Sequence, residues 1–212
     1  MFWVLSFALL HGCTPYTDGE PIKDGQPAKY GLLVLDMQND FLRPDGKMPI
    51  APGQAAGILN AVNGLLAFVA QNNIEAVYIG NEFNKSDRVA NWFRNNAALA
   101  GTEGARLVDG LKIINQNYFA KHHPDAFANP DFDRYLREKE ITRLAITGVF
   151  ADQCVMSTVK GALQRGYAVY AVSDGLGAKS DKKLATALDK LADLGVSVLT
   201  ASQLLDKLGE RE

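Results

Sequence analysis

The sequence predicts an α/β fold: a three-layer, doubly wound sheet of about six mainly parallel strands with helices on both faces. Two observations predict it. Short apolar runs alternate with amphipathic segments of helical length, and this alternation continues from residue 30 onward without a shift in composition. With 212 residues, 47% of them hydrophobic, the chain can also bury one sizeable core. We therefore expect a single domain over residues 30–212.

Residues 1–13 form an apolar leader ahead of this domain. Met1–Leu10 is uncharged and is followed by Gly12 and Cys13, an arrangement that resembles a bacterial lipoprotein signal. An apolar segment that packs on the domain is the second interpretation, and both stay open. The first predicts a lipid anchor at Cys13 and a place in the bacterial cell envelope, whereas the second is compatible with a cytoplasmic enzyme. Residues 14–29 are polar with proline and glycine, which is typical of a tether.

The elements of the domain follow in order from residue 30. Short apolar runs predict strands at Tyr30–Asp36, Ile74–Gly80, Lys112–Asn115, Arg143–Gly148, Ala168–Ser173 and Val196–Thr200. Between them, helical apolar spacing or helix-starting residues predict helices at Gly53–Gln71, Asp87–Leu99, Asp131–Glu138, Asp152–Arg165, Ser180–Leu194 and Ser202–Leu208. Helical connections favour parallel neighbouring strands, because a parallel pair needs a long crossover.

Charge and motif content exclude several function classes. The net charge is -2 and the charged residues are spread along the chain, so neither nucleic acid nor an acidic lipid surface is indicated as a partner. The chain has two cysteines without metal-ligand spacing, and it lacks both GxGxxG and GxxxxGK[ST]. We expect a small-molecule substrate and no cofactor.

Three residues at expected strand ends are candidates for chemistry, because ligands of open parallel sheets bind at the carboxyl ends of the strands. Asp36 ends a buried strand, where its carboxylate is either catalytic or pairs with a base or caps a turn. Cys154 follows a glycine-led turn and opens a helical pattern, and a cysteine at a helix start has a pKa lowered from about 8.5 towards neutral. A buried inert cysteine is the alternative. Lys121, in a mixed aromatic and basic loop, could stabilise a thiolate, although a lone lysine is more often simply solvated.

Taken together, these segments resemble the isochorismatase-like cysteine hydrolase superfamily, which includes nicotinamidases, ureide amidohydrolases and isochorismatases. The similarity extends over roughly residues 30–200. The matching pieces are Leu35–Phe41, Lys121, Ala126–Phe127, Thr147–Thr158, Gly166–Tyr167 and Ser173–Gly175.

The resemblance implies a role for each candidate. Asp36 is the general base and acid, Lys121 holds the charge of the pair, and Cys154 is the nucleophile that attacks a carbonyl. A non-proline cis peptide falls between Val149 and Phe150, and the backbone N–H groups of Phe150 and Cys154 form an oxyanion hole. The family also commonly forms dimers or tetramers, so a homo-oligomer is expected.

The resemblance also suggests a substrate pocket. Phe41 corresponds to an aromatic wall, and Gln38 lies on the same loop. By position alone Trp92 and Phe127 are further wall candidates, with the hydrophobic core as the equally good interpretation. We also assign the Phe150 side chain to this pocket.

The sequence departs from the nicotinamidase pattern after the second strand, where Gly80–Asp87 contains no histidine. His122 and His123 are adjacent, a poor spacing for two ligands of one metal. We therefore expect no metal. The leading hypothesis is a cysteine-dependent hydrolase of a C–N bond in a small amide or ureide. Hydrolysis of an isochorismate-type vinyl ether and a non-catalytic scaffold of the same fold are the alternatives.

Overall fold

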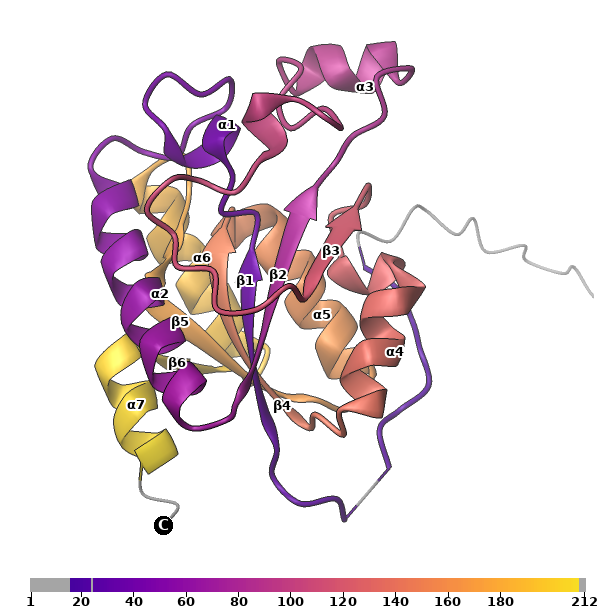
Figure 1. Ribbon diagram of the computed structural model, residues 1–212, viewed down its shortest axis with the longest axis vertical. Coiled ribbons are helices and arrows are strands. Elements are labelled where there is room, and N and C mark those ends of the chain that lie inside the picture. The colour runs from indigo at the N-terminus through magenta and orange to yellow at the C-terminus, as the bar shows by residue number, and fades with distance from the viewer. Residues whose placement is uncertain (1–15, 24, 210–212) are drawn as a thin grey trace, which may run out of the picture.

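The computed structural model describes residues 16–23 and 25–209, and in them six parallel strands form one sheet in the order β3-β2-β1-β4-β5-β6 (Figure 1). The strands are β1 Tyr30–Leu35, β2 Glu75–Asn81, β3 Tyr118–Lys121, β4 Arg143–Val149, β5 Ala168–Gly177 and β6 Ser197–Leu199. The predicted α/β class is confirmed. The leader and its candidate lipidation site at Cys13 lie outside the described residues.

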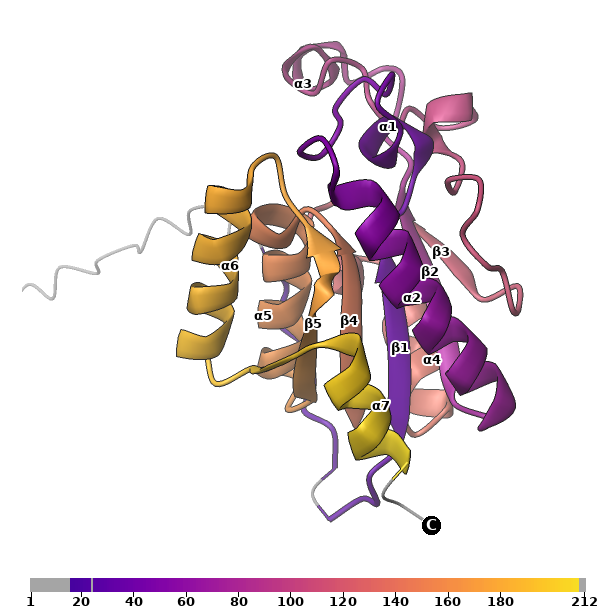
Figure 2. The ribbon, with the colours of Figure 1, turned by 90° about the vertical axis from the view of Figure 1, so that its left-hand side faces the viewer.

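Helices cover both faces of this sheet, as Figure 2 shows from the side. One face carries α2 Gln54–Gln71 and α7 Ala201–Gly209, and the other carries α4 Pro130–Glu138, α5 Met156–Gln164 and α6 Asp181–Asp193. The short helices α1 Asn39–Leu42 and α3 Arg88–Phe93 lie beyond the carboxyl ends of the strands, with turns at Glu103–Ala105, Ala126–Ala128 and Ala151–Val155. The molecule therefore has three layers, and its irregular segments gather at one end.

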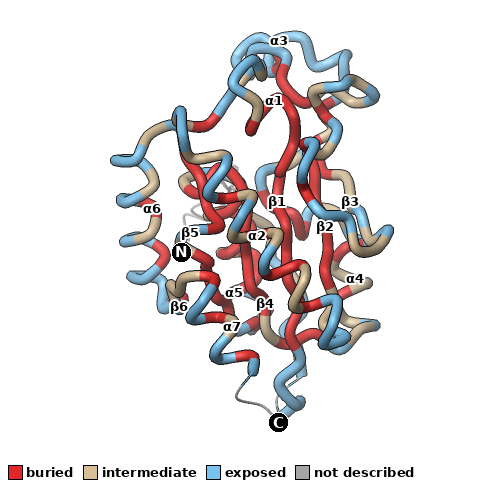
Figure 3. The backbone as a smooth tube through the Cα atoms, turned by 60° about the vertical axis from the view of Figure 1, so that its left-hand side comes forward, coloured by how far each residue is buried: buried red, intermediate tan, exposed pale blue. Residues whose placement is uncertain are grey.

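Strands β1, β2 and β4 are buried on both faces because each side of the sheet has its own apolar cluster. Leu32 and Val34 point to the side of α2 and α7, and Leu33 and Leu35 point to the side of α4, α5 and α6. This alternation is the period of two of a strand, and a strand buried on both sides is continuously apolar. Figure 3 shows the central strands as buried and α3 as an exposed projection.

The strand order reverses at β1, where the chain continues to β2 on one side and returns to β4 on the other. In such sheets the diverging loops leave a crevice at the carboxyl ends of the two central strands. Asp36 follows β1 and Cys154 follows β4, so the fold places both at this crevice.

The predicted third strand is wrong. Residues 112–115 are irregular, and the strand that pairs with β2 is Tyr118–Lys121. Side chains bind the irregular stretch in place of a sheet partner: Asn63 accepts the N–H of Lys112, and Asn115 donates to the carbonyl of Ala76. The aromatic and basic segment expected to be a loop is therefore the edge strand, and Lys121 is its last residue.

The helix predicted over Asp87–Leu99 is too long. It ends at Phe93, because Asn95, Asn96 and Ala98 have positive φ angles of 53°, 54° and 50°. Left-handed residues cannot continue a right-handed helix. The helix predicted over Asp152–Arg165 is likewise interrupted, since a π-helical turn at Ala151–Val155 precedes α5.

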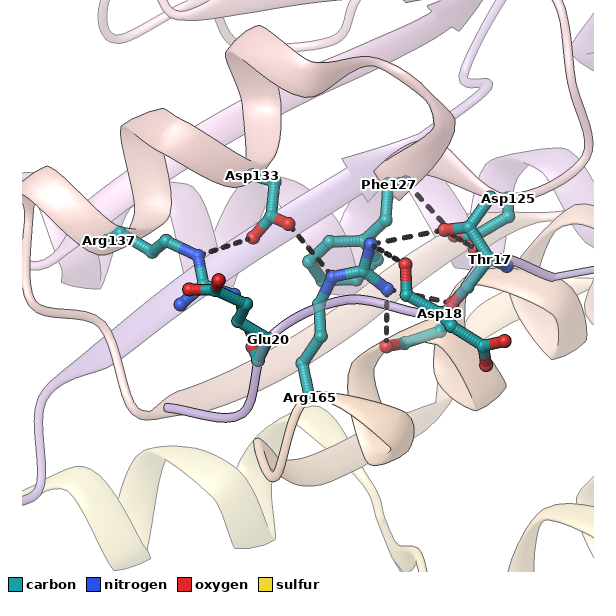
Figure 4. A network of polar contacts seen from close by, with 9 residues as sticks. Thr17, Asp18, Glu20, Asp125, Phe127, Asp133, Arg137 and Arg165 are labelled. Carbon is teal, nitrogen blue, oxygen red and sulfur yellow. Dashed lines mark hydrogen bonds and ion pairs between the residues drawn. The ribbon is translucent and has the colours of Figure 1, made fainter. Parts of the chain in front are cut away.

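The stretch expected to be a tether is docked on the domain wherever the structure describes it. Figure 4 shows the N-terminal strap, which we define as residues 16–23 and 25–29, beside α4 and α5. The N–H and hydroxyl of Thr17 donate to Asp125 at 2.6 and 2.8 Å. Arg165 donates to the carbonyls of Thr17 and Asp18 at 2.8 and 3.0 Å, and Arg137 donates to the carbonyl of Glu20.

The strap is bound to the domain because it supplies hydrogen-bond partners to charged side chains that the domain buries. Asp125 is fully buried, and Arg165 is 3% exposed. A buried charge without partners is costly, so binding of the polar strap stabilises the domain. None of the helices in residues 16–23 and 25–209 is long and apolar enough to cross a membrane.

Candidate active site

Four strands bring polar side chains to the crevice at the carboxyl end of the sheet. Asp36 follows β1, Asn81 ends β2, Lys121 ends β3, and Cys154 lies in the turn after β4. The carboxyl ends of parallel strands lie at one edge, so residues far apart in sequence meet there. Three of these are the residues that the sequence analysis selected, and Asn81 is the one that it missed.

Asp36 and Lys121 form a buried ion pair. Lys121 Nζ lies 3.0 Å from Asp36 Oδ2, and the two side chains are 1% exposed or less. Lys121 Nζ also donates to Asn81 Oδ1 at 2.6 Å. In the described part of the chain, neither carboxylate oxygen of Asp36 has a donor that meets full hydrogen-bonding geometry, although Lys121 Nζ lies 3.0 Å from Oδ2. The Cys154 and Asn81 side chains also interact with this carboxylate.

The backbone at Asp36 is held in an uncommon conformation. Its φ angle is 53°, in the left-handed region that aspartate enters at some cost. The N–H of Asp36 donates to the carbonyl of Ile79 at 2.7 Å, which continues the hydrogen bonding of β1 with β2 past the end of the strand. This turns the carboxylate out of the sheet edge towards Lys121.

Burial shifts the pKa values of both members of the pair. Loss of hydration raises the pKa of the Asp36 carboxyl, and the neighbouring Lys121 ammonium opposes this only in part. Burial alone would lower the pKa of Lys121. The negative charges of Asp36 and Cys154 together outweigh this effect, so the pKa of Lys121 is raised. Lys121 therefore stays charged, while Asp36 accepts a proton more readily than an exposed aspartate.

Cys154 lies in the π-helical turn and not in the first turn of α5. The expectation of a near-neutral thiol is wrong: burial raises the pKa of Cys154 to about 11, and the charge of Asp36 acts in the same direction against that of Lys121. Cys154 nevertheless keeps part of its surface exposed. Asn81 Nδ2 lies 3.9 Å from Sγ. In the resting protein at neutral pH the sulfur is therefore a thiol directed at Asp36.

The turn that carries Cys154 begins at a cis peptide bond between Val149 and Phe150. The carbonyl of Phe150 accepts hydrogen bonds from the N–H groups of Gln153 and Val155 at 3.0 and 3.2 Å, which closes the turn. Before it, Gly148 has a φ angle of 114°, and a Cβ there would lie 1.9 Å from the carbonyl oxygen of Leu35. Only glycine permits β4 to approach β1 this closely.

Phe41 packs on Phe150 at the start of this turn, and a third expected pocket residue, Gln38, contacts the end of β2. The rings of Phe41 and Phe150 meet edge to face at 5.5 Å, and both are buried. Gln38 is fully buried, and its amide binds the main chain of Asn81 and Ala105. Gln38 therefore positions Asn81 with all the polar atoms of its side chain already bonded.

The structure places the other two pocket candidates elsewhere. Phe127 is 3% exposed and packs in the core against Tyr167 and beneath the Arg165 guanidinium, which lies 4.5 Å from its ring. Trp92 is 73% exposed on α3 and contacts the ring of Phe93. Phe127 thus supports the face on which the strap docks, and Trp92 belongs to the projecting helix.

Of the histidines in residues 16–23 and 25–209, His123 makes a side-chain hydrogen bond, and it lies within its own loop. His123 Nδ1 accepts the N–H of Asp125 at 3.2 Å within its own loop. Among residues 16–23 and 25–209, no group of three histidine, cysteine, aspartate or glutamate side chains could hold a metal ion.

Comparisons with known proteins agree with this architecture. A family model described as the isochorismatase domain matches residues 30–203. The uncharacterized isochorismatase family protein YddQ of Bacillus subtilis is 30% identical over 145 residues, which are 68% of this chain and 74% of YddQ. The probable inactive nicotinamidase At3g16190 of Arabidopsis thaliana is 26% identical, over 84% of this chain and 95% of its own.

The chain is also similar to relatives that carry amide-hydrolase names and to solved structures that match most of the fold. Ureidoacrylate amidohydrolase RutB of Caulobacter segnis is 27% identical, over 63% of this chain and 66% of RutB. The crystal structure of an isochorismatase-like hydrolase from Alkaliphilus metalliredigens superposes with a TM-score of 0.78 at 28% identity. That match covers 85% of this chain and 100% of the other.

Proposed function

Because the chain belongs to the isochorismatase family of hydrolases, we propose that it is a cysteine-dependent amidohydrolase that cleaves a C–N bond of a small molecule through a thioester on Cys154. One observation carries the proposal: the Cys154 side chain interacts with a buried carboxylate, Asp36, which also pairs with Lys121 at 3.0 Å. A nucleophile beside a base that a third group orients is the arrangement needed for covalent catalysis.

The raised pKa values of Asp36 and Cys154 suit a mechanism in which Asp36 removes the thiol proton while Cys154 attacks the substrate. Asp36 takes the proton from Sγ as sulfur bonds to the substrate carbonyl carbon, so a free thiolate need not accumulate. A carboxyl with a raised pKa accepts this proton readily, and the neighbouring Lys121 stays charged. Lys121 is thus the charge-holding partner in both states of Asp36.

The rest of the reaction returns the proton to the leaving group. The carbonyl oxygen becomes an oxyanion, for which the N–H groups of Phe150 and Cys154 are the proposed donors. The C–N bond then breaks as Asp36 protonates nitrogen, and ammonia or an amine departs. Water, deprotonated by Asp36, attacks the thioester, and the acyl product leaves as the S–C bond breaks and Sγ regains its proton.

The test is release of ammonia by the full chain across a panel of small amides and ureides, beside Cys154→Ala and a matched Cys13→Ser control. We expect turnover of at least one compound by the wild type and by Cys13→Ser, and none by Cys154→Ala. If pyruvate is released from an isochorismate-type ether instead, and Cys154→Ala retains that activity, the vinyl-ether hydrolase replaces the thiol mechanism. Absence of any turnover would favour the scaffold.

A further inference from the structure

A cavity beside the candidate active site is lined by three cationic side chains. Its volume is about 430 Å³, and its walls come from the loop after α1, the end of α3 and the residue before the N-cap of α6. The lining includes Lys47, Met48, Ile50, Arg94 and Lys179, and none of the described residues that line it is aspartate or glutamate.

Arg94 is the most confined of these cations. Its guanidinium carbon lies 3.7 Å from the centroid of the Phe83 ring, and its Nη2 donates to Asn91 Oδ1 at 3.2 Å. Its Nε is buried and has no acceptor among the described residues. Burial lowers the pKa of Arg94, and the charge of Asp87 opposes that shift. An arginine stays protonated in proteins, so the cavity wall retains a positive charge.

The two lysines add charge that no described carboxylate neutralises through an ion pair. Lys47 Nζ donates to the backbone carbonyl of Asn96 at 3.1 Å, and Lys179 Nζ lies 5.9 Å from the centroid of the Phe150 ring. The nearby carboxylate of Asp40 is bonded to the N–H groups of Lys47 and Ala98. The cavity thus has a surplus of positive charge.

Two chains of contacts connect this cavity to the segment that carries Cys154. Phe150, over whose ring Lys179 lies, begins the turn that carries Cys154. The N–H of Ile50 donates to the carbonyl of Phe41, whose ring packs on Phe150. The negative charge of an ionised Cys154 also raises the pKa of Arg94, which means that the two groups are within electrostatic reach.

We infer that this cavity binds a carboxylate of the substrate, so that the amide or ureide cleaved at Cys154 belongs to a molecule that also carries an acid group. The inference rests on the proposed function and names its substrate class. The planar guanidinium of an arginine pairs with a carboxylate through two parallel hydrogen bonds, which a neutral amide cannot reproduce. Met48 and Ile50 supply apolar walls for the carbon chain that joins the acid to the amide.

The test compares two alkylating agents that differ in charge but hardly in shape, iodoacetate and iodoacetamide. Both react with Cys154 without any need for turnover. Their rates at pH 9 are measured by mass spectrometry of the Cys154 peptide, and each is divided by its rate with N-acetylcysteine. We expect the normalised rate of iodoacetate to exceed that of iodoacetamide by about tenfold or more, the usual effect of a hydrogen bond to a charged group.

Substitutions assign this preference to the cavity. Arg94→Gln should abolish most of it, and Arg94→Lys should keep part of it. Arg88→Gln is the matched control, because Arg88 is exposed on the same helix and does not line the cavity. It should change the preference less than twofold. Equal normalised rates in the wild type, or a preference that Arg94→Gln leaves unchanged in a folded variant, would overturn the inference.

Turnover distinguishes failure of this inference from failure of the proposed function. The matched substrates are succinamate against succinamide, and N-carbamoylglycine against N-carbamoylglycinamide. Faster hydrolysis of the acids, with KM raised by Arg94→Gln, supports both proposals. Hydrolysis of the neutral compounds alone overturns the anionic site and leaves the amidohydrolase. An Arg94-dependent preference for iodoacetate without hydrolysis of any amide supports the anionic site and counts against the proposed chemistry.

Discussion

Gln38 holds Asn81 by both of its backbone groups. Gln38 Nε2 donates to the Asn81 carbonyl at 2.8 Å, and the Asn81 N–H donates to Gln38 Oε1 at 2.9 Å. A side-chain amide here takes the place of a neighbouring strand, at the point where β2 ends. Asn81 in turn accepts a hydrogen bond from Lys121 and approaches Cys154, so one buried glutamine fixes the residue that links base and nucleophile.

Replacement of Gln38 by methionine should therefore lower both stability and activity. The variant leaves the N–H and carbonyl of Asn81 without partners, and an unsatisfied buried group costs about 1–3 kcal/mol. We expect the free energy of unfolding to fall by at least that amount in urea, and kcat to fall more than KM changes. Gln71→Met, at an exposed site at the end of α2, is the control. Equal behaviour of the two variants would show that Gln38 has no special role.

Removal of the Lys121 charge should lower the free energy of unfolding at neutral pH, and should lower it less in acid. Lys121→Met leaves Asp36 buried without its cation, which destabilises by about 3–5 kcal/mol. The pKa of Asp36, already raised, rises further. A carboxyl whose pKa is higher in the folded than in the unfolded state favours folding below the unfolded pKa and loses that contribution as pH rises. Urea unfolding at pH 5 and pH 7.5 should thus show the variant closer to the wild type at pH 5.

The double variant Asp36→Asn, Lys121→Met provides the control for that measurement. It removes both charges together, so it should be more stable at pH 7.5 than Lys121→Met alone and should lose the pH dependence. A double variant as unstable as the single one would assign the loss to packing and not to charge.

The Cys154 thiol should titrate well above an ordinary cysteine. Burial raises its pKa to about 11, so the rate of alkylation by iodoacetamide should continue to rise up to pH 10 without a plateau. Asp36→Asn removes a negative charge that raises this pKa, and the same profile should move to lower pH. A plateau below pH 9 in the wild type would contradict the burial argument.

Loss of Arg165 should release the N-terminal strap. Arg165 pairs with Asp133 at 2.9 Å and donates to Thr17 and Asp18, so Arg165→Met removes the partners of a buried cluster. We expect a loss of about 3–5 kcal/mol and faster proteolysis within residues 16–29. Arg106→Met is the control, because Arg106 is exposed and its ion pair with Glu103 contributes about 1 kcal/mol or less. Unchanged proteolysis would mean that other contacts hold the strap.

Much of the fold could be predicted from local pattern. The apolar runs of β1 and β4 stand out because strands buried on both faces leave no polar alternation. The start of α6 could also be predicted, because serine is a preferred N-cap residue and Ser180 accepts the N–H of Lys183. The third strand was missed because it is short and lies at the edge, where Tyr118–Lys121 carries no run of buried apolar residues.

The sequence by itself determined the α/β class, the family resemblance and the selection of Asp36, Lys121 and Cys154, because apolar periodicity and short motifs are local features. Only the tertiary structure decided that Gln38 fixes Asn81, that the strap is docked, and that Lys47, Arg94 and Lys179 line one cavity. It also reversed the expected shift of the Cys154 pKa. The physical reason is shared: hydration and charge at a site depend on groups that approach from distant parts of the chain, and no local pattern records which of them will meet.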